Sequence, residues 1–250
     1  MPSSTPVLIL PGYGDSGPDH WQSHWERTDP TLRRVMQDDW LLPKLADWMA
    51  RLEEEVRACV APPVLAAHSL ACSLVAHWAT RPGARAAGAL LVAPADVDSP
   101  AHTADEVRNF SPVPLVPLPF PSVVVASTDD PFVTPARAAA FARAWGSRLV
   151  TVERAGHLNA DAGFGPWPEG RRLHGELTMS WKVRPKRDRD KTRVRIPFAT
   201  PPSRRAGAVF TTPPQGVAQL PACSRVRIPL ACVQSDDIEG SLACSRRPSS

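Results

Sequence analysis

The sequence has few cysteines, and no two of them form a C-x-x-C pair. The five cysteines of this 250-residue chain are too scattered for a disulfide framework or a structural zinc site. The N-terminus lacks a basic segment, and its apolar run covers only residues 7–10, which argues against a signal peptide. No apolar run is long enough to cross a bilayer. We therefore expect a soluble, cytoplasmic protein with reduced thiols and no membrane partner.

Charge is unevenly distributed along the chain. Residues 181–250 contain 14 Lys/Arg and 5 Asp/Glu, a net charge of +9, whereas the whole chain carries +4, so residues 1–180 carry −5. The basic part is rich in Pro, Ser and Arg and has too few large apolar residues to form a core. We expect a folded domain over residues 1–180 and a disordered tail over residues 181–250. Nucleic-acid binding by the tail is disfavoured, because no aromatic residues alternate with its dispersed arginines.

The first 180 residues alternate apolar runs with helical patterns. An amphipathic helix is expected over residues 42–59, a second helix from Leu70, and a third over residues 135–145, capped by Thr134. Strands that are continuous apolar runs and alternate with helices predict an α/β fold, a three-layer sandwich with a mostly parallel sheet. The expected strands cover residues 7–10, 32–36, 64–67, 89–92, 122–126 and 149–152.

Residues suited to a catalytic triad follow three of these strands. Ser69, the pair Asp129-Asp130, and His157 each come shortly after a predicted strand, in this order along the chain. Ligands of parallel sheets bind at the carboxyl ends of the strands, and the order Ser, Asp, His is that of α/β-hydrolases. We expect Ser69 to be the nucleophile, His157 the base, and one of the two aspartates the residue that orients the imidazole. The residue types alone do not separate Asp129 from Asp130.

Each of these residues also has an ordinary structural interpretation. Serine is a favoured N-cap, so Ser69 could simply begin the helix that follows it. Asp130 precedes a proline and suits the start of a turn, and a histidine in a glycine-containing loop indicates little by itself. Their occurrence at three strand ends in the hydrolase order favours the catalytic interpretation.

A glycine-rich turn, PGYG at residues 11–14, follows the first strand. We expect it to place the backbone N–H of Tyr13 beside Ser69, where it would form an oxyanion hole with the N–H of Leu70. A phosphate-binding loop is excluded because no G-K-[ST] follows. The predicted pocket lining consists of His68, Gly12 and Gly14.

Four stretches together resemble a known family. LPGYGDSGPDHWQSHWE near the start, AHSLAC at the serine, ASTDDPFV after a later strand and AGHLNADAGFGPWPEG at the histidine resemble the small serine hydrolases of the retinoblastoma-binding protein 9 type. The resemblance covers about residues 7–177. It implies an α/β-hydrolase without a large cap or a cofactor, acting on small esters or on peptide-like substrates. It also implies that the acid is Asp130, the aspartate immediately before the proline.

Two other features carry less weight. His20 and His24 have the spacing of two metal ligands on a helix, but the glutamate of zinc proteases and a third ligand are missing, so we expect no metal and a structural or pocket-lining role for His20 and Trp21. The charged run over residues 94–107 is expected to be a solvated loop.

The serine motif departs from the general hydrolase pattern at both ends. Ala67 and Ala71 stand where that pattern has glycine, and a Cβ there crowds the strand against the helix, more so at Ala71. The sequence predicts a serine hydrolase that cleaves a small ester, or an amide, through an acyl-enzyme. The alternative is a hydrolase-fold protein that binds a partner without turnover. The oligomeric state is left open.

Overall fold

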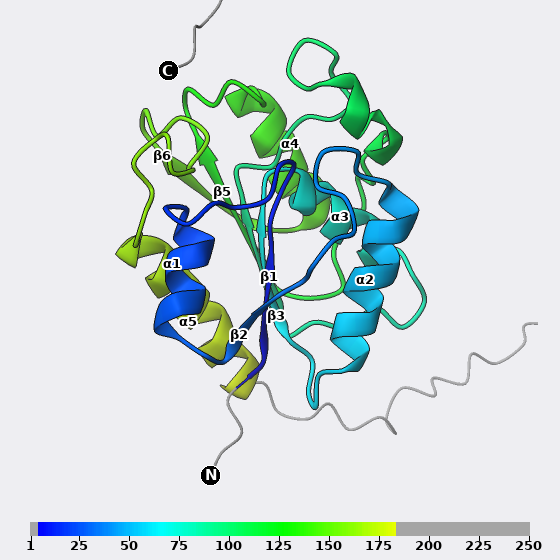
Figure 1. Cartoon of the computed structure of the whole chain (residues 1–250), viewed down its shortest axis with the longest axis vertical. Coiled ribbons are helices and arrows are strands. Elements are labelled where there is room, and N and C mark those ends of the chain that lie inside the picture. The colour runs from blue at the N-terminus through cyan, green and yellow to red at the C-terminus, as the bar shows by residue number, and fades with distance from the viewer. Residues whose placement is uncertain (1–4, 184–250) are drawn as a thin grey trace, which may run out of the picture. The chain divides into compact units, whose positions relative to one another are not determined.

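The computed structural model describes residues 5–183, and in this part of the chain six parallel strands form one sheet (Figure 1). The sheet order is β2-β1-β3-β4-β5-β6. The predicted tail lies outside the described residues, except that residues 181–183 end the last helix. The strands are β1 (Val7–Leu10), β2 (Leu32–Arg34), β3 (Val64–His68), β4 (Gly88–Val92), β5 (Ser122–Ser127) and β6 (Arg148–Val152).

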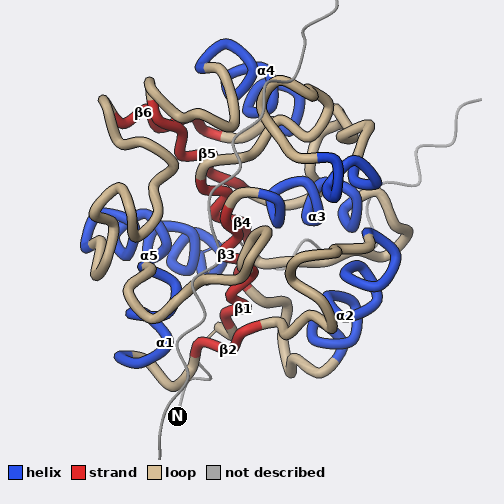
Figure 2. The backbone as a smooth tube through the Cα atoms, turned by 45° about the horizontal axis from the view of Figure 1, so that its top comes forward, coloured by secondary structure: helices blue, strands red, loops and turns tan. Residues whose placement is uncertain are grey.

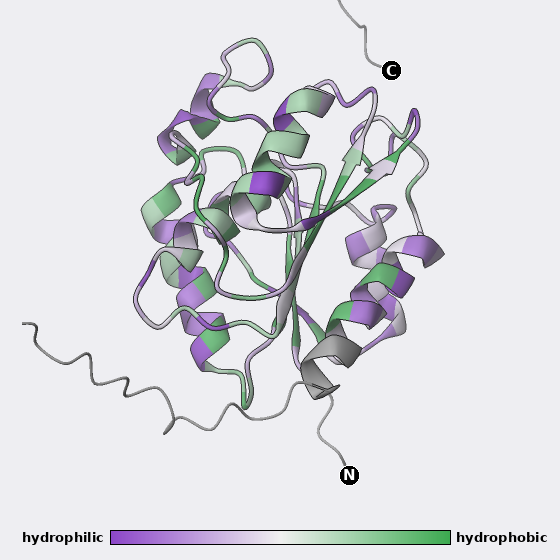
Figure 3. Cartoon of the chain, turned by 180° about the vertical axis from the view of Figure 1, so that it is seen from behind, coloured by the Kyte–Doolittle hydropathy of each residue, from purple (hydrophilic) through white to green (hydrophobic). Residues whose placement is uncertain are grey.

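Helices cover both faces of the sheet, which confirms the predicted three-layer architecture. Figure 2 shows α2, α3 and α4 on one side of the strands and α1 and α5 on the other. In Figure 3 the strands are mainly hydrophobic, whereas the helices alternate hydrophobic and hydrophilic stretches. The helices are α1 (Trp21–Thr28), α2 (Leu45–Arg57), α3 (Leu70–Ala79), α4 (Pro135–Trp145) and α5 (Pro168–Val183), with a 3₁₀ helix at Asp105–Phe110.

Strand side chains alternate between two hydrophobic cores. In β1, Leu8 and Leu10 pack in the core beneath α2, α3 and α4, while Val7 and Ile9 pack in the core beneath α1 and α5. Successive strand residues point to opposite faces, so a strand covered on both faces must be apolar throughout. This is why the central strands β1, β3, β4 and β5 are nearly continuous apolar runs, whereas the edge strands β2 and β6 contain polar or exposed residues. The fully buried tryptophans of the two cores are Trp48, Trp78 and Trp145 on the first side and Trp21 and Trp25 on the second.

The helices differ from the sequence predictions at identifiable places. The helix expected from residue 42 begins at Leu45, because Asp39 accepts the N–H groups of Leu41 and Leu42 and Pro43 then disfavours helix in the residue before it. Thr134 caps α4 as expected, accepting from the N–H of Arg137. Helices α1 and α5 were not predicted. No helix in the described residues combines the length and the apolar character that a membrane span needs.

Candidate active site

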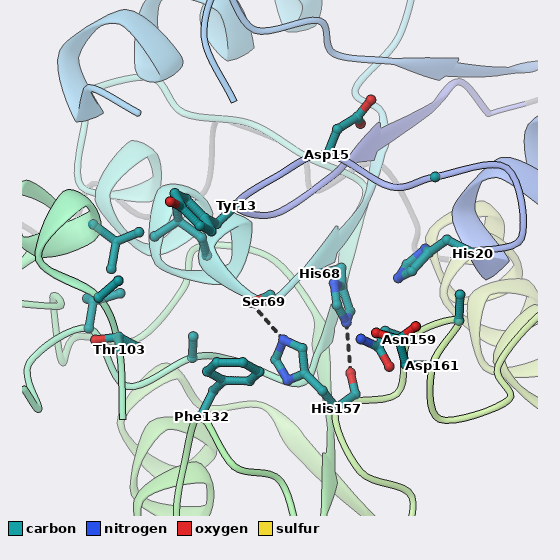
Figure 4. A pocket seen from close by; sticks show the side chains of 17 residues that line it. Tyr13, Asp15, His20, His68, Ser69, Thr103, Phe132, His157, Asn159 and Asp161 are labelled. Atoms are coloured by element: carbon teal, nitrogen blue, oxygen red, sulfur yellow. Dashed lines mark hydrogen bonds between the residues drawn. The ribbon is translucent and has the colours of Figure 1, made fainter. Parts of the chain in front are cut away.

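The ends of β3, β5 and β6 bring the three predicted triad residues together. Ser69 follows β3, Asp130 lies three residues after β5, and His157 lies five residues after β6. β3 is separated from β5 by β4 alone, and β5 pairs with β6, so all three strands end at the same edge of the sheet. Figure 4 shows Ser69 and His157 side by side, joined by a hydrogen bond.

The backbone of Ser69 has a conformation that residues other than glycine rarely adopt. Its φ of 55° and ψ of −119° put it in a strained region at the turn from β3 to α3. Ser69 stands at the N-cap position of α3, yet its side chain makes no capping hydrogen bond. Its Oγ instead lies 2.9 Å from Nε2 of His157. The geometry therefore differs from that of an ordinary helix-capping serine.

The second ring nitrogen of His157 faces Asp130. Nδ1 lies 2.9 and 3.0 Å from the two carboxylate oxygens of Asp130, whose side chain is fully buried. Because a carboxylate only accepts, Nδ1 carries the proton and Nε2 is left to accept from the Ser69 hydroxyl. The backbone N–H of Phe132 also donates to Asp130, at 2.9 Å, and the Phe132 ring packs edge-on against the imidazole.

The neighbouring carboxylate, Asp129, binds different partners. It accepts from Oγ of Ser127 at 2.7 Å and from the backbone N–H of Gly156 at 2.8 Å. Ser127 in turn accepts from the N–H of Ala155. These hydrogen bonds, that of Ser127 first, lower the pKa of the Asp129 carboxyl. Asp129 thus attaches the loop before His157 to the end of β5 and does not touch the imidazole.

A second histidine holds the loop from the other side. Nε2 of His68 donates to the backbone carbonyl of His157 at 2.9 Å, and the two rings pack edge to face. Burial, followed by the nearby charges of His157 and His20, keeps the pKa of His68 well below its ordinary value. His68 is therefore neutral, and it fixes the position of the His157 backbone.

The glycine-rich turn packs directly against the serine. A Cβ placed on Gly12 would lie 2.9 Å from Cβ of Ser69 and 3.3 Å from the backbone nitrogen of Leu70, so only glycine fits there. Among the described residues, the N–H groups of Tyr13 and Leu70 donate to no protein acceptor. The oxyanion hole predicted for these two groups stays a prediction, with which their lack of a protein acceptor is compatible. Ala67 and Ala71 are both fully buried beside this turn.

A cavity of about 490 Å³ opens at the serine. His68 and Tyr13 line it, but the predicted lining by Gly12 and Gly14 is wrong. Gly12 is covered by Ser69, and the chain at Gly14 turns away, where its N–H donates to the carbonyl of Trp40. The remaining lining residues that matter below are His20, Ala95, Val97, Thr103, Val107, Phe132, Asn159 and Asp161.

The charged run over residues 94–107 is solvated only in part, because Asp105 and Glu106 are exposed as expected but Asp96 and Asp98 bind groups within the protein. Asp96 is 8% exposed and pairs with Arg137, and Asp98 accepts from Arg137, from Oγ of Ser111 and from the N–H of Val113. Val97, between these two carboxylates, lines the cavity, as do Ala95 and Val107 of the same run. Charged residues that pair within the protein have the same sequence pattern as solvated ones, so no local pattern indicates the partners of Asp96 and Asp98.

The described residues contain no group of three or more His, Cys, Asp or Glu side chains arranged to hold a metal ion. His20 lines the cavity, whereas Trp21 is completely buried and donates its ring N–H to the carbonyl of Leu158. Of the two roles that we considered for this pair, His20 therefore has the pocket-lining one and Trp21 the structural one.

Comparison with known proteins identifies a family for this chain. A family model described as serine hydrolase matches residues 7–176. No curated protein matches significantly. Among solved structures, a protein described as a YdeN-like hydrolase from Pectobacterium atrosepticum has 34% sequence identity and a TM-score of 0.64, over 71% of this chain and 92% of that one.

Two more distant structures share the fold. The ydeN gene product of B. subtilis has 21% identity and a TM-score of 0.58, over 70% of this chain and 99% of that one. A thermophilic esterase from Thermogutta terrifontis has 16% identity and a TM-score of 0.54, over 71% of this chain and 90% of that one. The narrower resemblance to the retinoblastoma-binding protein 9 type stays a prediction. The extent of the family match and the α/β-hydrolase fold of these neighbours show that the chain belongs to the serine hydrolase family.

Proposed function

We propose that the protein hydrolyses a small ester through an acyl-enzyme formed on Ser69. The observation that carries the proposal is the continuous hydrogen-bond chain from Ser69 through His157 to the buried Asp130. Ser69 begins α3 without capping it, so its hydroxyl is committed to the imidazole and not to the helix. In this proposal Ser69 is the nucleophile, His157 the general base and acid, and Asp130 the residue that fixes the imidazole tautomer.

Acylation begins when Nε2 of His157 takes the hydroxyl proton while Oγ of Ser69 attacks the ester carbonyl carbon. The carbonyl oxygen becomes an oxyanion, which the N–H groups of Tyr13 and Leu70 stabilise. When the tetrahedral intermediate collapses, the bond to the alcohol breaks, and His157 returns the proton to the departing oxygen. Asp130 stabilises the imidazolium that exists between the two proton transfers.

Deacylation repeats these steps with water as the nucleophile. His157 takes a proton from the water, the resulting hydroxide attacks the acyl carbon, and the acid is released as Oγ of Ser69 regains its proton from the imidazolium. The same groups therefore act in both halves of the reaction. All of them come from this chain, and the reaction needs no oxidant or reductant.

The size of the cavity supports a small substrate. A volume of about 490 Å³ is within the range of sites that hold small molecules. The structural neighbour described as an esterase supports ester hydrolysis. An amide is the second substrate class, since the same steps cleave it if His157 protonates the leaving nitrogen.

The alternative is a protein that binds a partner without turnover. It was suggested by the alanines that replace the glycines of the general serine motif. Ala67 and Ala71 are fully buried while Ser69 keeps its strained conformation and its hydrogen bond to His157. The extra Cβ atoms are thus compatible with the arrangement that turnover requires, and we favour the enzyme.

Labelling the full-length chain with a fluorophosphonate probe tests the proposal. We expect labelling of the wild type, no labelling of Ser69→Ala, and a strong decrease in His157→Ala. The matched control is Ser73→Ala, one turn further along α3, whose buried hydroxyl has no hydrogen-bond partner. It should be labelled like the wild type.

Hydrolysis of p-nitrophenyl butyrate provides the second measurement. Removing the nucleophile should lower kcat by at least about a thousandfold. Circular dichroism should show that the variants remain folded. The proposal fails if the folded wild type is neither labelled nor active, or if Ser69→Ala is labelled as strongly as Ser73→Ala.

A further inference from the structure

One polar atom in the wall of the cavity lacks a partner. His20 is 4% exposed and lines the cavity, and its Nε2 is buried without any hydrogen-bond partner in the protein. Nδ1 of the same ring accepts the backbone N–H of Gln22 at 3.2 Å, which caps the start of α1. Buried polar groups of native proteins are almost always hydrogen-bonded, so this atom indicates a missing acceptor.

The cap determines which ring nitrogen carries the proton. Because Nδ1 accepts a hydrogen bond, the proton of the neutral ring is on Nε2, and the unpartnered atom is a donor. Burial first, and then the nearby charges of His157 and Arg34, lowers the pKa of His20 to about 3. At neutral pH His20 is therefore a fixed N–H donor and not a proton-transfer group.

The two sides of the cavity differ in polarity. In Figure 4, Ser69 lies between two groups of labelled side chains: His20, Asn159 and Asp161 on one side, and Tyr13, Phe132 and Thr103 on the other. Near Phe132 and Thr103 the wall is apolar, with Ala95, Val97 and Val107. A ligand that fills the cavity across Ser69 meets polar groups on the His20 side and apolar groups on the opposite side.

His68 does not satisfy the His20 donor. Their rings pack edge to face with centroids 4.7 Å apart, and Nε2 of His68 is engaged by the carbonyl of His157. Asp15 also lines the cavity, but its carboxylate is held by Arg34 at 2.8 Å. Neither neighbour supplies an acceptor, so a group bound in the cavity can complete the hydrogen bonding of His20.

We propose that the His20 side of the cavity binds an uncharged amide of the substrate, whose carbonyl oxygen accepts from Nε2–H of His20. This inference rests on the proposed esterase function and specifies the substrate class of the same site. An anionic group is disfavoured there because the carboxylate of Asp161 lines the cavity too, whereas that of Asp15 is paired with Arg34. An amide suits both features, because its oxygen meets the His20 donor and its N–H is attracted by the Asp161 carboxylate.

Two pairs of isosteric esters test the inference. The first pair places the amide in the acyl half of the substrate, and the second places it in the alcohol half. The first pair is the p-nitrophenyl esters of N-acetylglycine and of 4-methylpentanoic acid. The second pair is 2-acetamidoethyl butanoate and 4-methylpentyl butanoate, whose hydrolysis is measured by the release of butanoic acid. The measured quantity is the ratio of kcat/KM for the amide ester to kcat/KM for its hydrocarbon isostere, each corrected for its rate with hydroxide.

Two substitutions of His20 separate the donor from the helix cap. His20→Asn keeps a side-chain acceptor for the Gln22 N–H but is too short to donate at the position of Nε2. His20→Gln reaches further and can present an N–H there. The matched control is His24→Asn, one turn along α1, at a residue that does not line the cavity.

We expect the ratio to decrease about tenfold in His20→Asn for at least one pair, the effect of one neutral hydrogen bond. It should largely recover in His20→Gln and stay at the wild-type value in His24→Asn. The inference is overturned if the ratio in His20→Asn stays within twofold of wild type for both pairs, or if His20→Gln loses as much as His20→Asn.

The wild type alone also tests the inference, should His20→Asn fail to fold. A wild-type enzyme that prefers the hydrocarbon isostere in both pairs would overturn it. Failure of the wild type to hydrolyse any of the four esters would instead contradict the proposed function itself, so the two failures are distinguishable.

Discussion

At the scale of single residues, two adjacent aspartates with the same chemistry have different partners. The Asp130 side chain is fully buried and contacts the imidazole of His157, whereas Asp129 is exposed and accepts from Ser127 and Gly156. Successive residues of a turn point in different directions, so neighbours one position apart reach different parts of the fold. Substituting each of them separately should therefore affect the enzyme in different ways.

Asp130→Asn should lower kcat by about a thousandfold to ten-thousandfold. The asparagine amide can donate to Nδ1, which stabilises the imidazole tautomer that carries its proton on Nε2. In this tautomer Nε2 cannot accept the proton of the Ser69 hydroxyl. The measurement is the hydrolysis of p-nitrophenyl butyrate, with circular dichroism as the check on folding. A kcat within tenfold of wild type in the folded variant would remove Asp130 from the proposed mechanism.

Asp129→Ala should lower kcat by between about tenfold and a hundredfold, because the loop that carries His157 loses its attachment to the end of β5. Asp129 is a positioning residue in this account, since it acts through the backbone of Gly156. Asp129→Asn retains an oxygen that can accept from Ser127 and Gly156 and should recover most of the activity. Equal losses in the alanine and asparagine variants would show that its negative charge matters instead.

The candidate triad could be predicted because each member follows a strand, and strand ends can be recognised in the sequence. The choice between Asp129 and Asp130 could not be made from residue types, because it depends on side-chain direction in a turn. The sequence left a structural and a pocket-lining role open for His20, and residue types could not choose between them. Its position in the cavity wall follows from the path of the chain before α1, which no local pattern indicates.

At the scale of elements, one arginine organises the loop that forms the apolar side of the cavity. Arg108, in the 3₁₀ helix Asp105–Phe110, donates to the backbone carbonyls of Val97, Ser99 and Thr103 and to the Thr103 hydroxyl. A buried loop needs partners for its carbonyl groups, and a guanidinium with five donors can supply several of them at once. The shape of this side of the cavity therefore depends on Arg108.

Arg108→Ala should lower the preference for a long apolar acyl chain, which the apolar side of the cavity suits better than the polar His20 side. Without the guanidinium, Val97 and Thr103 lose their fixed position, so the apolar wall is less well formed and kcat/KM for p-nitrophenyl hexanoate should decrease about tenfold relative to the acetate ester. The acetate ester is too short to use that wall. The control is Arg51→Ala, which removes only exposed ion pairs on α2. An unchanged hexanoate-to-acetate ratio would contradict this role.

The four central strands were predicted to within one residue because burial on both faces makes them nearly continuous apolar runs. The edge strands β2 and β6, which contain polar or exposed residues, were predicted to within two residues. Helix α1 was missed because it has eight residues and its cap is His20, which is not one of the favoured capping residues. The 3₁₀ helix was missed for a related reason, since it is stabilised by loop contacts and not by an apolar stripe. Elements that depend on tertiary contacts leave little trace in local sequence.

At the scale of the whole described domain, several histidines are buried in their neutral form. Burial is the first cause that lowers the pKa of His20 to about 3, that of His174 from 6.5 to about 4, and that of His68 well below its ordinary value. Folding therefore holds these rings deprotonated over a pH range in which the unfolded chain would bind protons. Protons favour the state that binds more of them, so acid should favour unfolding.

His174, on α5, is the best site for testing this linkage because it does not line the cavity at Ser69. Between about pH 6.5 and pH 4 the unfolded chain binds a proton at this position and the folded chain does not, so the free energy of unfolding decreases as the pH falls. The decrease in wild type between pH 7.5 and pH 5, measured by urea denaturation of the full-length chain, should be smaller by about 1–2 kcal/mol in His174→Phe.

His174→Gln separates protonation from packing. Neither phenylalanine nor glutamine titrates, yet they fill the space beside Trp25 differently, so the two variants should differ in stability at neutral pH and agree in how stability changes with pH. A loss of packing contributes equally at both pH values and cancels in the difference, whereas the proton uptake of the unfolded histidine does not. If both variants lose as much stability in acid as wild type, then His174 binds a proton in the folded protein, and the acid sensitivity of the fold must come from other groups.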